Sequence, residues 1–370
     1  MLRELPYALQ KAVKYPYKIA RDVQANTVEA LFLSAELARS FSEASGVQVA
    51  LPYRVERTAF ESNPIDSRFA LALYDFAPAL GWRQDAHLRP MELRASLRAL
   101  ADWHAFFWLG HDPDGAKAKL AAGVWETGSY WHLGQQPEGQ LAKLKPNWER
   151  LAQEFGYPRE WDLGARLEGL AVAASEQAHG LDAANGKVAA WANSKYQTII
   201  HGDPKAPNLF FKGEAEVGMI DLQWCGRGIG AVDVAYCIAA SADASAFEGG
   251  AHSATQALLD EYHQHLLGAF ERYGVAENAA DAAKVLPRET FQEQVGHLRS
   301  CRCWPSQARR SMHQDSLLNP RNSGFYPFFT HFPPFFAHFQ RLDARNPENT
   351  TRSPGENGKK SKKIGENRGN

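Results

Sequence analysis

Two short apolar runs, each carrying an aspartate at or just after its end, constrain the fold of this chain more than any other feature. The run Tyr196–Ile200 leads into His-Gly-Asp, whose aspartate is Asp203, and the run Val217–Leu222 contains Asp221 near its end. Between them lie Asn208, a Leu-Phe-Phe run and a glycine turn. Short apolar runs bounded by turn residues are typical of β-strands. The pattern therefore predicts strands that hold Asp203, Asn208 and Asp221 on one rim.

These three side chains have the chemistry that phosphoryl transfer requires. An acceptor hydroxyl needs a carboxylate that orients it and takes its proton, and Asp203 is the candidate. Mg²⁺ prefers hard oxygen ligands, such as the amide oxygen of Asn208 and the carboxylate of Asp221. An Asp, an Asn a few residues later and an Asp after the next hairpin form the catalytic layout of protein-kinase-like enzymes. We therefore predict Asp203 and His201 as catalytic residues, with His201 bracing the loop, and Asn208 and Asp221 as metal ligands.

Other interpretations of the same residues stay open. A His-Gly-Asp by itself is often only a turn, and Asp221 could simply cap a strand. Asp233 could be the N-cap of a helix that begins at Val234. His201 and Asp203 could instead bind a metal in a hydrolase, although the nearby sequence offers no further His or Asp partners at helical or strand spacing.

Three ordered motifs carry a resemblance to a known family. His201–Asn208, HGDPKAPN, resembles the HGDxxxxN signature of the aminoglycoside phosphotransferase and choline-kinase-like superfamily. Ile220–Trp224, IDLQW, resembles the ID(F/L)Q element that stands where protein kinases carry DFG. Val232–Tyr236, VDVAY, is similar to the xDLAY that follows it. Together they resemble the ecdysteroid-kinase-like or CHK-kinase-like branch, which implies an ATP- and Mg²⁺-dependent phosphotransferase acting on a hydroxyl of a small organic molecule.

The same resemblance implies a lysine–glutamate pair that positions the nucleotide phosphates. Glu29 lies in a stretch whose apolar residues recur with a helical period, and it matches the glutamate of the family's VExxFY element. Lys14 is the candidate partner, with Lys11 and Lys18 as rivals. Ordinary solvated lysines are the competing interpretation.

The N-terminal part of the sequence departs from the kinase pattern. No glycine occurs before Phe41, so we expect the phosphate-covering hairpin of a kinase small lobe to be missing. Arg68–Asp75 reads as a strand, and the resemblance implies that Asp75 lies against the adenine where the chain crosses between lobes. The incomplete lobe leaves an alternative function open, a catalytically impaired kinase-like protein that binds a nucleotide or another ligand.

From Pro90 onward the apolar residues recur with a helical period. This predicts a long helix reaching Trp108, in which His104 is a buried core histidine rather than a ligand. Further helices are predicted at Trp148–Phe155, Leu163–Ala178 and Ala254–Tyr273. The fold class is therefore α+β: a two-lobed protein-kinase-like fold with a truncated N-terminal lobe and a mainly helical C-terminal lobe.

We expect three parts along the chain. Residues 1–85 would form the partial N-terminal lobe, and residues 86–296 the C-terminal lobe with the catalytic and metal-binding loops. Residues 297–370 are atypical. Their Pro-rich aromatic clusters and a charged, glycine- and asparagine-rich end have the composition of a disordered or mispredicted tail.

Composition excludes several other classes. The 370 residues are 44% hydrophobic, enough for a substantial core, and the net charge of −1 gives no argument for nucleic acid or an acidic membrane surface. The four cysteines contain no CxxC pair and so imply neither zinc nor a disulfide framework. No run reaches membrane-spanning length. We predict a cytoplasmic protein whose partner is a small-molecule hydroxyl substrate, without nucleic acid or membrane. The substrate's identity and the oligomeric state stay open.

Overall fold

The computed structural model describes residues 16–58, 66–129, 133, 139–169, 172, 181–182, 187–188 and 195–300. Contacts divide the chain into two units, Met1–Thr330 and His331–Asn370, and every described element lies in the first. Lys14, Lys11 and all residues beyond 300 lie outside the described residues. The predictions that concern them therefore stay predictions.

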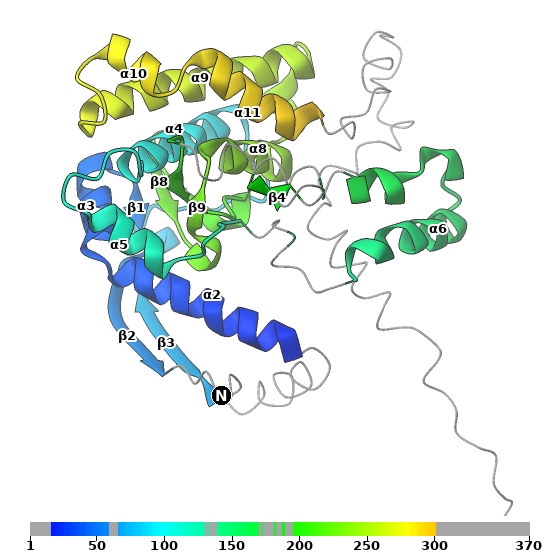
Figure 1. Ribbon diagram of the computed structural model, residues 1–370, viewed down its shortest axis with the longest axis horizontal. Coiled ribbons are helices and arrows are strands. Elements are labelled where there is room, and N and C mark those ends of the chain that lie inside the picture. The colour runs from blue at the N-terminus through cyan, green and yellow to red at the C-terminus, as the bar shows by residue number, and fades with distance from the viewer. Residues whose placement is uncertain are drawn as a thin grey trace, which may run out of the picture. The chain divides into compact units, whose positions relative to one another are not determined.

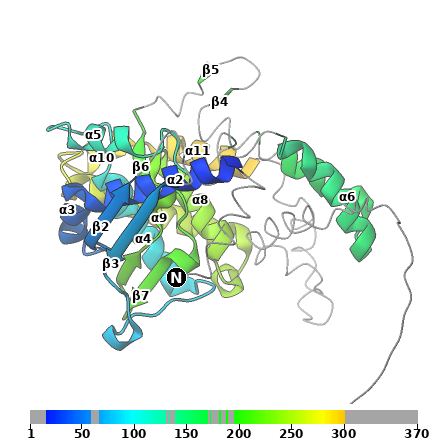
Figure 2. The same cartoon turned by 90° about the horizontal axis from the view of Figure 1, so that it is seen from below.

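The N-terminal elements are two helices followed by three short strands (Figure 1). They are α2 (Pro16–Ser34), α3 (Glu36–Ser45), β1 (Gln48–Val49), β2 (Pro52–Thr58) and β3 (Arg68–Leu73). Strand β2 pairs antiparallel with β3, and Figure 2 shows this pair beside α2. Helix α2 begins well before the run that showed helical periodicity, because a proline at its first position is pre-organised for the helix. Lys18 lies on this helix, and its pairing with Glu29 stays a prediction.

The segment that follows α3 forms two separate strands. Strand β1 pairs in parallel with β8 (Glu216–Met219), whereas β2 joins the separate β2–β3 pair. The chain turns between them, with the amide of Leu51 donating to the carbonyl of Val49. The N-terminal region thus contributes one strand directly to the sheet that carries the predicted metal ligand.

Helix α4 (Pro90–Phe106) is the helix predicted from the apolar period, and it ends just before Trp108. It contacts α8 (Gly230–Ser241), α9 (Ala251–Arg272) and β6 (Thr198–Ile200). The remaining α-helices with printed bounds are α5 (Ala116–Gly123), α6 (Leu144–Phe155), α10 (Ala279–Val285) and α11 (Arg288–Ser300), and residues 163–169 are also helical. Short 3₁₀ turns are η2 (Pro78–Leu80), η4 (Leu141–Lys143), η5 (Arg159–Trp161), η6 (Ala206–Asn208), η7 (Leu222–Trp224) and η8 (Ala244–Phe247). The predicted α+β class, with a mainly helical C-terminal part, is confirmed.

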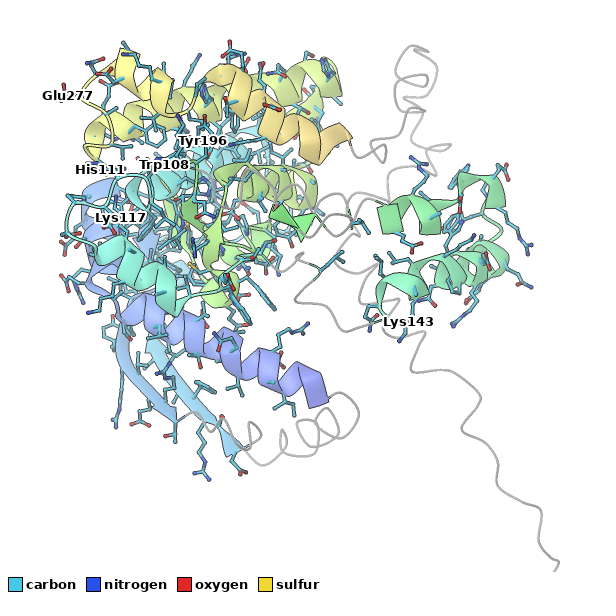
Figure 3. The ribbon with its side chains drawn as sticks, in the orientation of Figure 1. Trp108, His111, Lys117, Lys143, Tyr196 and Glu277 are labelled. Carbon is cyan, nitrogen blue, oxygen red and sulfur yellow. The ribbon has the colours of Figure 1, made fainter. Side chains whose placement is uncertain are left out.

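The loop between α4 and α5 is fastened by a buried lysine (Figure 3). The ammonium of Lys117 donates to the carbonyl of His111 at 2.7 Å, and burial lowers the pKa of this lysine. Lys117 therefore holds a loop and has a structural role.

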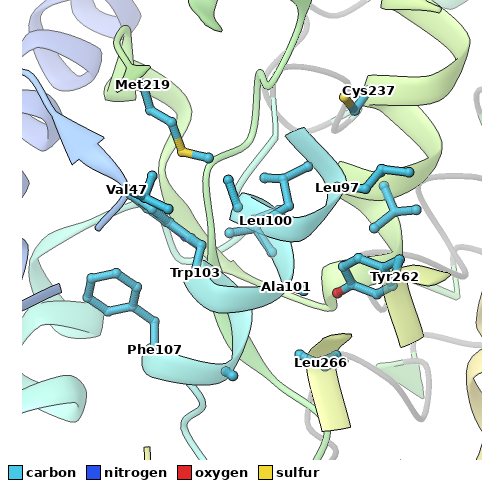
Figure 4. Packing of buried hydrophobic residues seen from close by; sticks show 14 of the residues in the cluster. Val47, Leu97, Leu100, Ala101, Trp103, Phe107, Met219, Cys237, Tyr262 and Leu266 are labelled. Carbon is cyan, nitrogen blue, oxygen red and sulfur yellow. The ribbon is translucent and has the colours of Figure 1, made fainter. Parts of the chain in front are cut away.

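The core joins the N-terminal helices to the strand that precedes the predicted catalytic loop. Trp103 of α4 packs on Phe32, Phe41 and Phe107, with ring centroids 4.9–5.2 Å apart. Its indole N–H donates to the carbonyl of Ile199 in β6 at 2.8 Å. Figure 4 shows the packing around α4, with Tyr262 and Leu266 of α9 on one side and Val47 and Met219 on another. One contiguous core thus fixes the end of β6 in space.

Two antiparallel pairs carry the predicted site. Strand β6 pairs with β9 (Gly226–Gly228), and β7 (Leu209–Lys212) pairs with β8 through a turn at Gly213. The strand predicted at 217–222 ends early, at Met219, because Asp221 adopts φ 62° and ψ 62°, the left-handed region that interrupts extended backbone.

Among the described residues, no helix combines the length and apolarity needed to cross a bilayer.

Candidate active site

The loop that follows β6 is pressed against the turn that follows β8. Gly202 has φ 85°, and a Cβ at this position would overlap the carbonyl oxygen of Trp224 in η7 (Leu222–Trp224). Only glycine can combine this conformation with such a close approach. The His-Gly-Asp sequence therefore places its aspartate beside the turn that carries Asp221.

Asn208 lies between the two aspartates, as the spacing predicted. Its side-chain nitrogen donates to the backbone carbonyl of Asp203 at 2.9 Å and to Oδ2 of the same residue at 3.2 Å. Its backbone carbonyl accepts from the amide of Ile220 at 3.1 Å. Since Leu209 is paired with Met219, the next residues on the two strands, Asn208 and Ile220, are also neighbours, and Asp221 follows. The structure thus brings Asp203, Asn208 and Asp221 together.

The two carboxylate oxygens of Asp203 have different surroundings. Oδ2 accepts from the ammonium of Lys205 at 2.5 Å and from Asn208. Oδ1 is buried and has no hydrogen-bond partner among the described residues. Burial raises the pKa of Asp203, while the Lys205 ammonium and the Tyr236 hydroxyl oppose this shift. Asp203 is therefore held by one oxygen and unsatisfied at the other.

Asp221 shares this property. Its Oδ1 is also buried without a hydrogen-bond partner in the described part of the chain. The side chain of Glu29 lies near it: the amide of Leu222 donates to Glu29 Oε1 at 3.1 Å, and the Gln223 side chain donates to Oε2 at 3.5 Å. Burial, and then the negative charge of Asp221, raise the pKa of Glu29. Glu29 is thus bonded to the Asp221 turn, whereas its predicted partner Lys14 lies outside the described residues.

The backbone of the loop is held from behind by Asp233. The amides of His201 and Gly202 donate to its two carboxylate oxygens, at 2.7 and 3.0 Å. Helix α8 begins at Gly230 with Ile229 as its N-cap, so the alternative in which Asp233 is an N-cap is wrong. At Gly230 the helix lies close to His104 of α4 and Tyr262 of α9, a contact that the local sequence does not reveal.

Both histidines near the loop are fully buried. His201 accepts from the amide of Asp203 through Nδ1 at 3.3 Å, which braces the loop, and its Nε2 has no partner among the described residues. His104 is hydrogen-bonded to Asp233 and to the hydroxyl of Tyr262. The prediction that His104 is a satisfied core histidine is confirmed.

Asp75 is exposed in the segment that links β3 to η2. The next residue, Phe76, anchors that segment: its ring lies 4.7 Å from Trp82 and 5.1 Å from Phe210 of β7. The linking segment therefore runs against the hairpin that carries Asn208. An adenine contact at Asp75 stays a prediction.

The donor set fits a divalent cation. Two buried aspartate oxygens lack partners, and Glu29 and Asp203 both have raised pKa values in part because of the charge of Asp221. Within the described residues no group of three or more His, Cys, Asp or Glu is placed to hold a metal. A site here would therefore need the amide oxygen of Asn208, which belongs to the hard-oxygen class that Mg²⁺ prefers.

The sequence reasoning gave no role to several residues around the site. The Tyr236 hydroxyl lowers the pKa of Asp203, and its spacing of three from Asp233 places the two on one face of α8. Trp125 stacks on Trp224 at 5.8 Å, and its indole N–H donates to the carbonyl of Gln223 at 2.7 Å. The helical spacing could have identified Tyr236, whereas no local signal points to Trp125.

No curated protein sequence matches the chain. Among solved structures, the chain is similar to the amicoumacin kinase hAmiN in complex with AMP-PNP, Ca²⁺ and Ami, with 13% identity, 75% of this chain and 73% of that chain covered, and a TM-score of 0.32. That score is too low to establish a shared fold.

A model of the ecdysteroid kinase-like family matches residues 81–275, more than half of the chain. The matched range contains Asp203, Asn208 and Asp221, and it begins after Glu29 and Asp75. The chain belongs to the ecdysteroid kinase-like family.

Proposed function

We propose that this chain is a phosphotransferase that transfers the γ-phosphoryl group of ATP, with Mg²⁺, to a hydroxyl of a small organic molecule. One observation carries the proposal: Asp203 and Asp221 each keep a buried oxygen without a partner among the described residues, on the rim that also holds Asn208. A buried acceptor without a partner costs about 1–3 kcal/mol. Membership of the ecdysteroid kinase-like family indicates phosphoryl transfer as the reaction in which these two oxygens would be used.

Asp203 is the proposed catalytic base. Lys205 and Asn208 hold its Oδ2, so the orientation of the carboxylate is fixed. This leaves Oδ1 to accept a hydrogen bond, and then the proton, from the acceptor hydroxyl. A raised pKa makes the carboxylate a stronger base, while the Lys205 ammonium favours the ionised form that a base needs. His201 braces the backbone of the loop through its Nδ1.

Asn208 and Asp221 are the proposed metal ligands, through their side-chain oxygens. The donation from Asn208 Nδ2 to Asp203 fixes the amide plane, which leaves the amide oxygen of Asn208 available as a ligand. When bound, Mg²⁺ would offset the negative charge that builds up on the phosphates. Glu29 positions Asp221 from behind, through its hydrogen bond with the amide of Leu222.

Two further assignments are carried from the family resemblance: Lys14 as the partner of Glu29, and Asp75 beside the adenine. The acceptor is a small molecule, and a cytoplasmic location without nucleic-acid or membrane partners stays a prediction.

The hydrogen bonds of Glu29 favour a second candidate function. This carboxylate is bonded to Leu222 and Gln223, and no lysine side chain in the described residues is bonded to it. A kinase-like protein whose phosphate-positioning pair is incomplete would bind a nucleotide or another ligand with impaired turnover, because positioning supplies much of the catalysis of phosphoryl transfer.

Binding and turnover separate the two candidates. Thermal unfolding of the full chain is measured with ATP, with Mg²⁺ and with both, and ATP consumption is then followed over pools of small alcohols. We expect the midpoint to rise only when both are present, and one pool to stimulate ATP consumption. Binding without turnover in any pool would favour the second candidate, and the absence of a Mg²⁺-dependent ATP shift would count against the phosphotransferase.

A further inference from the structure

A chain of hydrogen bonds runs from helix α9 to the catalytic loop through two other helices. The hydroxyl of Tyr262 lies 2.7 Å from Nδ1 of His104, and Nε2 of His104 lies 3.1 Å from Oδ2 of Asp233. The same oxygen accepts from the amide of His201, and the other accepts from Gly202. These four side chains, on α9, α4, α8 and the loop, are at most 1% exposed.

The direction of each hydrogen bond follows from the donors and acceptors available. An ionised carboxylate only accepts, so Nε2 of His104 must donate to Asp233. Burial and the negative charge of Asp233 raise the pKa of Tyr262 well above its ordinary value, so its hydroxyl keeps the proton and needs an acceptor. Nδ1 of His104 can be that acceptor only if the imidazole is neutral. His104 is therefore the neutral form with its proton on Nε2.

A glycine makes this arrangement possible. Gly230 begins α8, and a Cβ at this position would lie 2.7 Å from the hydroxyl of Tyr262 and 2.8 Å from Nδ1 of His104. Both distances are shorter than real side chains allow, so a larger residue would separate α8 from the other two helices. Because α8 carries Asp233, the close approach at Gly230 sets where that carboxylate meets the loop.

We propose that Tyr262 and His104 are positioning residues, which fix Asp233 and through it the backbone that presents Oδ1 of Asp203. Neither side chain touches a reacting atom. The consequence for turnover rests on the proposed phosphotransfer, whereas the order imposed on the loop does not. A purely structural contribution would instead stabilise the whole core without a selective effect at residues 201 and 202.

Amide hydrogen exchange on the full chain distinguishes these roles. Tyr262→Phe keeps the aromatic ring, which stacks on Phe291 at 5.3 Å, and removes only the hydroxyl. Loss of one hydrogen bond corresponds to about a tenfold change in an equilibrium. We expect the amides of His201 and Gly202 to exchange about tenfold faster relative to the amide of Ile199, which bonds to Phe107.

A matched control is available on the same two helices. The hydroxyl of Tyr273, the residue that caps α9, donates to Asp102 of α4 at 3.0 Å, a hydrogen bond that does not involve Asp233 or His104. Tyr273→Phe makes the identical chemical change and should leave exchange at His201 and Gly202 as in the unmodified protein. Equal effects of the two substitutions on these amides, or no effect of either, would overturn the proposal.

The tautomer of His104 gives a second readout, which is measured first on the unmodified protein. Nitrogen NMR of ¹⁵N-histidine-labelled protein should show His104 neutral and protonated on Nε2, with Tyr262→Phe changing the Nδ1 signal. A charged imidazole, or a proton on Nδ1, would contradict the assignment. His104→Gln retains a donor for Asp233 and should keep slow exchange at residues 201 and 202, whereas His104→Met should lose it.

Kinetics connects the relay to the proposed function. We expect Tyr262→Phe to lower kcat about tenfold with the KM for ATP unchanged, and Tyr273→Phe to change neither. An unchanged kcat together with faster loop exchange would overturn the catalytic part of the proposal. If the protein binds no Mg²⁺-dependent ATP, the phosphotransferase proposal fails, while the exchange and NMR results still decide whether the relay orders the loop.

Discussion

The catalytic loop is met by carboxylates on two sides, and the two sides are built differently. Behind the loop, Asp233 accepts three hydrogen bonds and is fully buried. On the rim in front, Asp203 and Asp221 are each left with one buried oxygen that lacks a partner among the described residues. The aspartates thus serve two purposes. Asp233 holds the backbone in place, whereas Asp203 and Asp221 each keep an oxygen that can bind a ligand from outside the chain.

The energetic contrast explains why the difference matters. Each unpaired buried acceptor costs about 1–3 kcal/mol, which is a large share of the stability of a typical domain. Behind the loop the fold avoids this cost completely, even though a carboxylate is buried there. Two of the buried side-chain atoms without a partner among the described residues belong to the aspartates of this rim, whereas Oε2 of Glu92 lies elsewhere, on α4. The meeting of two such aspartate oxygens with Asn208 is the physical reason for regarding the rim as the site.

Asp203→Asn should give the largest effect, and on activity alone. Removing the base is expected to lower kcat by about 10²–10⁴-fold, the range for general base catalysis. The thermal midpoint should stay the same or rise, because burial raises the pKa of Asp203 and its charge is therefore costly in the folded state. Asp281→Asn, in the exposed first turn of α10, is the control and should change neither. If Asp203→Asn lowered stability as well as activity, Asp203 would have a structural role like that of Asp233.

Asp233→Asn tests the carboxylate behind the loop, and unlike Asp203→Asn it should lower the stability of the protein. The amide retains one oxygen for the backbone donors but presents an N–H₂ group where Asp233 accepts the other hydrogen bonds. Leaving one or two buried donors unpaired should lower the free energy of unfolding by roughly 2–4 kcal/mol. Asp102→Asn, a partly exposed carboxylate on α4, should cost less than about 1 kcal/mol. Denaturant unfolding measures both, and equal losses would remove the distinction between the two sides.

Asp221→Asn should act on the metal requirement. Asparagine tolerates the left-handed backbone at this position, so the substitution removes charge without straining the turn. Substitution of a residue that only hydrogen-bonds to a metal ligand commonly lowers metal affinity by about 10- to 100-fold. Asp221 is proposed to be a ligand itself, so we expect the Mg²⁺ concentration at half-maximal ATP binding to rise at least about 100-fold. Glu216→Ala, an exposed residue on the same hairpin, serves as the control. An unchanged Mg²⁺ requirement would assign the unpaired oxygen of Asp221 to another role.

The side facing the rim could be predicted from the sequence because its geometry is local. Asn208 and Asp221 flank two strands joined by one tight turn, so the pairing of Leu209 with Met219 brings them together. The turn at Gly202 also follows from its own residue type. The left-handed conformation of Asp221 has no such signal, and it ended the strand earlier than its apolar run suggested.

The side behind the loop could not be predicted in the same way. Its contacts join residues far apart in sequence, with 158 positions between His104 and Tyr262 and 129 between His104 and Asp233. Similarly, the bond from Leu222 to Glu29 spans 193 positions. Helical periodicity identified the helices, but it does not say which of their polar residues meet. Local patterns therefore predict the chemistry, and the tertiary packing decides how it is held.

Glu29→Gln should give the smallest effect and shows whether the rim's carboxylates repel one another. Burial and Asp221 raise the pKa of Glu29 above its ordinary value of 4.5, so the folded protein binds this proton more tightly than the unfolded chain. Stability of the unmodified protein should therefore fall as pH rises from 4.5 through the folded pKa. Glutamine lacks this titration, so its thermal midpoint should exceed the parent's by about 2 °C at neutral pH and by less near pH 4.5.

The control for this titration is Glu36→Gln, on the exposed first turn of α3, which should follow the parent at every pH. Added Mg²⁺ should shrink the advantage of Glu29→Gln, because a dication beside Asp221 would offset the repulsion that raises the pKa of Glu29. If the thermal midpoints of the parent and of Glu29→Gln changed with pH in parallel, the negative charge of Glu29 would be as well compensated as that of Asp233. The contrast between the two sides of the loop would then be limited to Asp203 and Asp221.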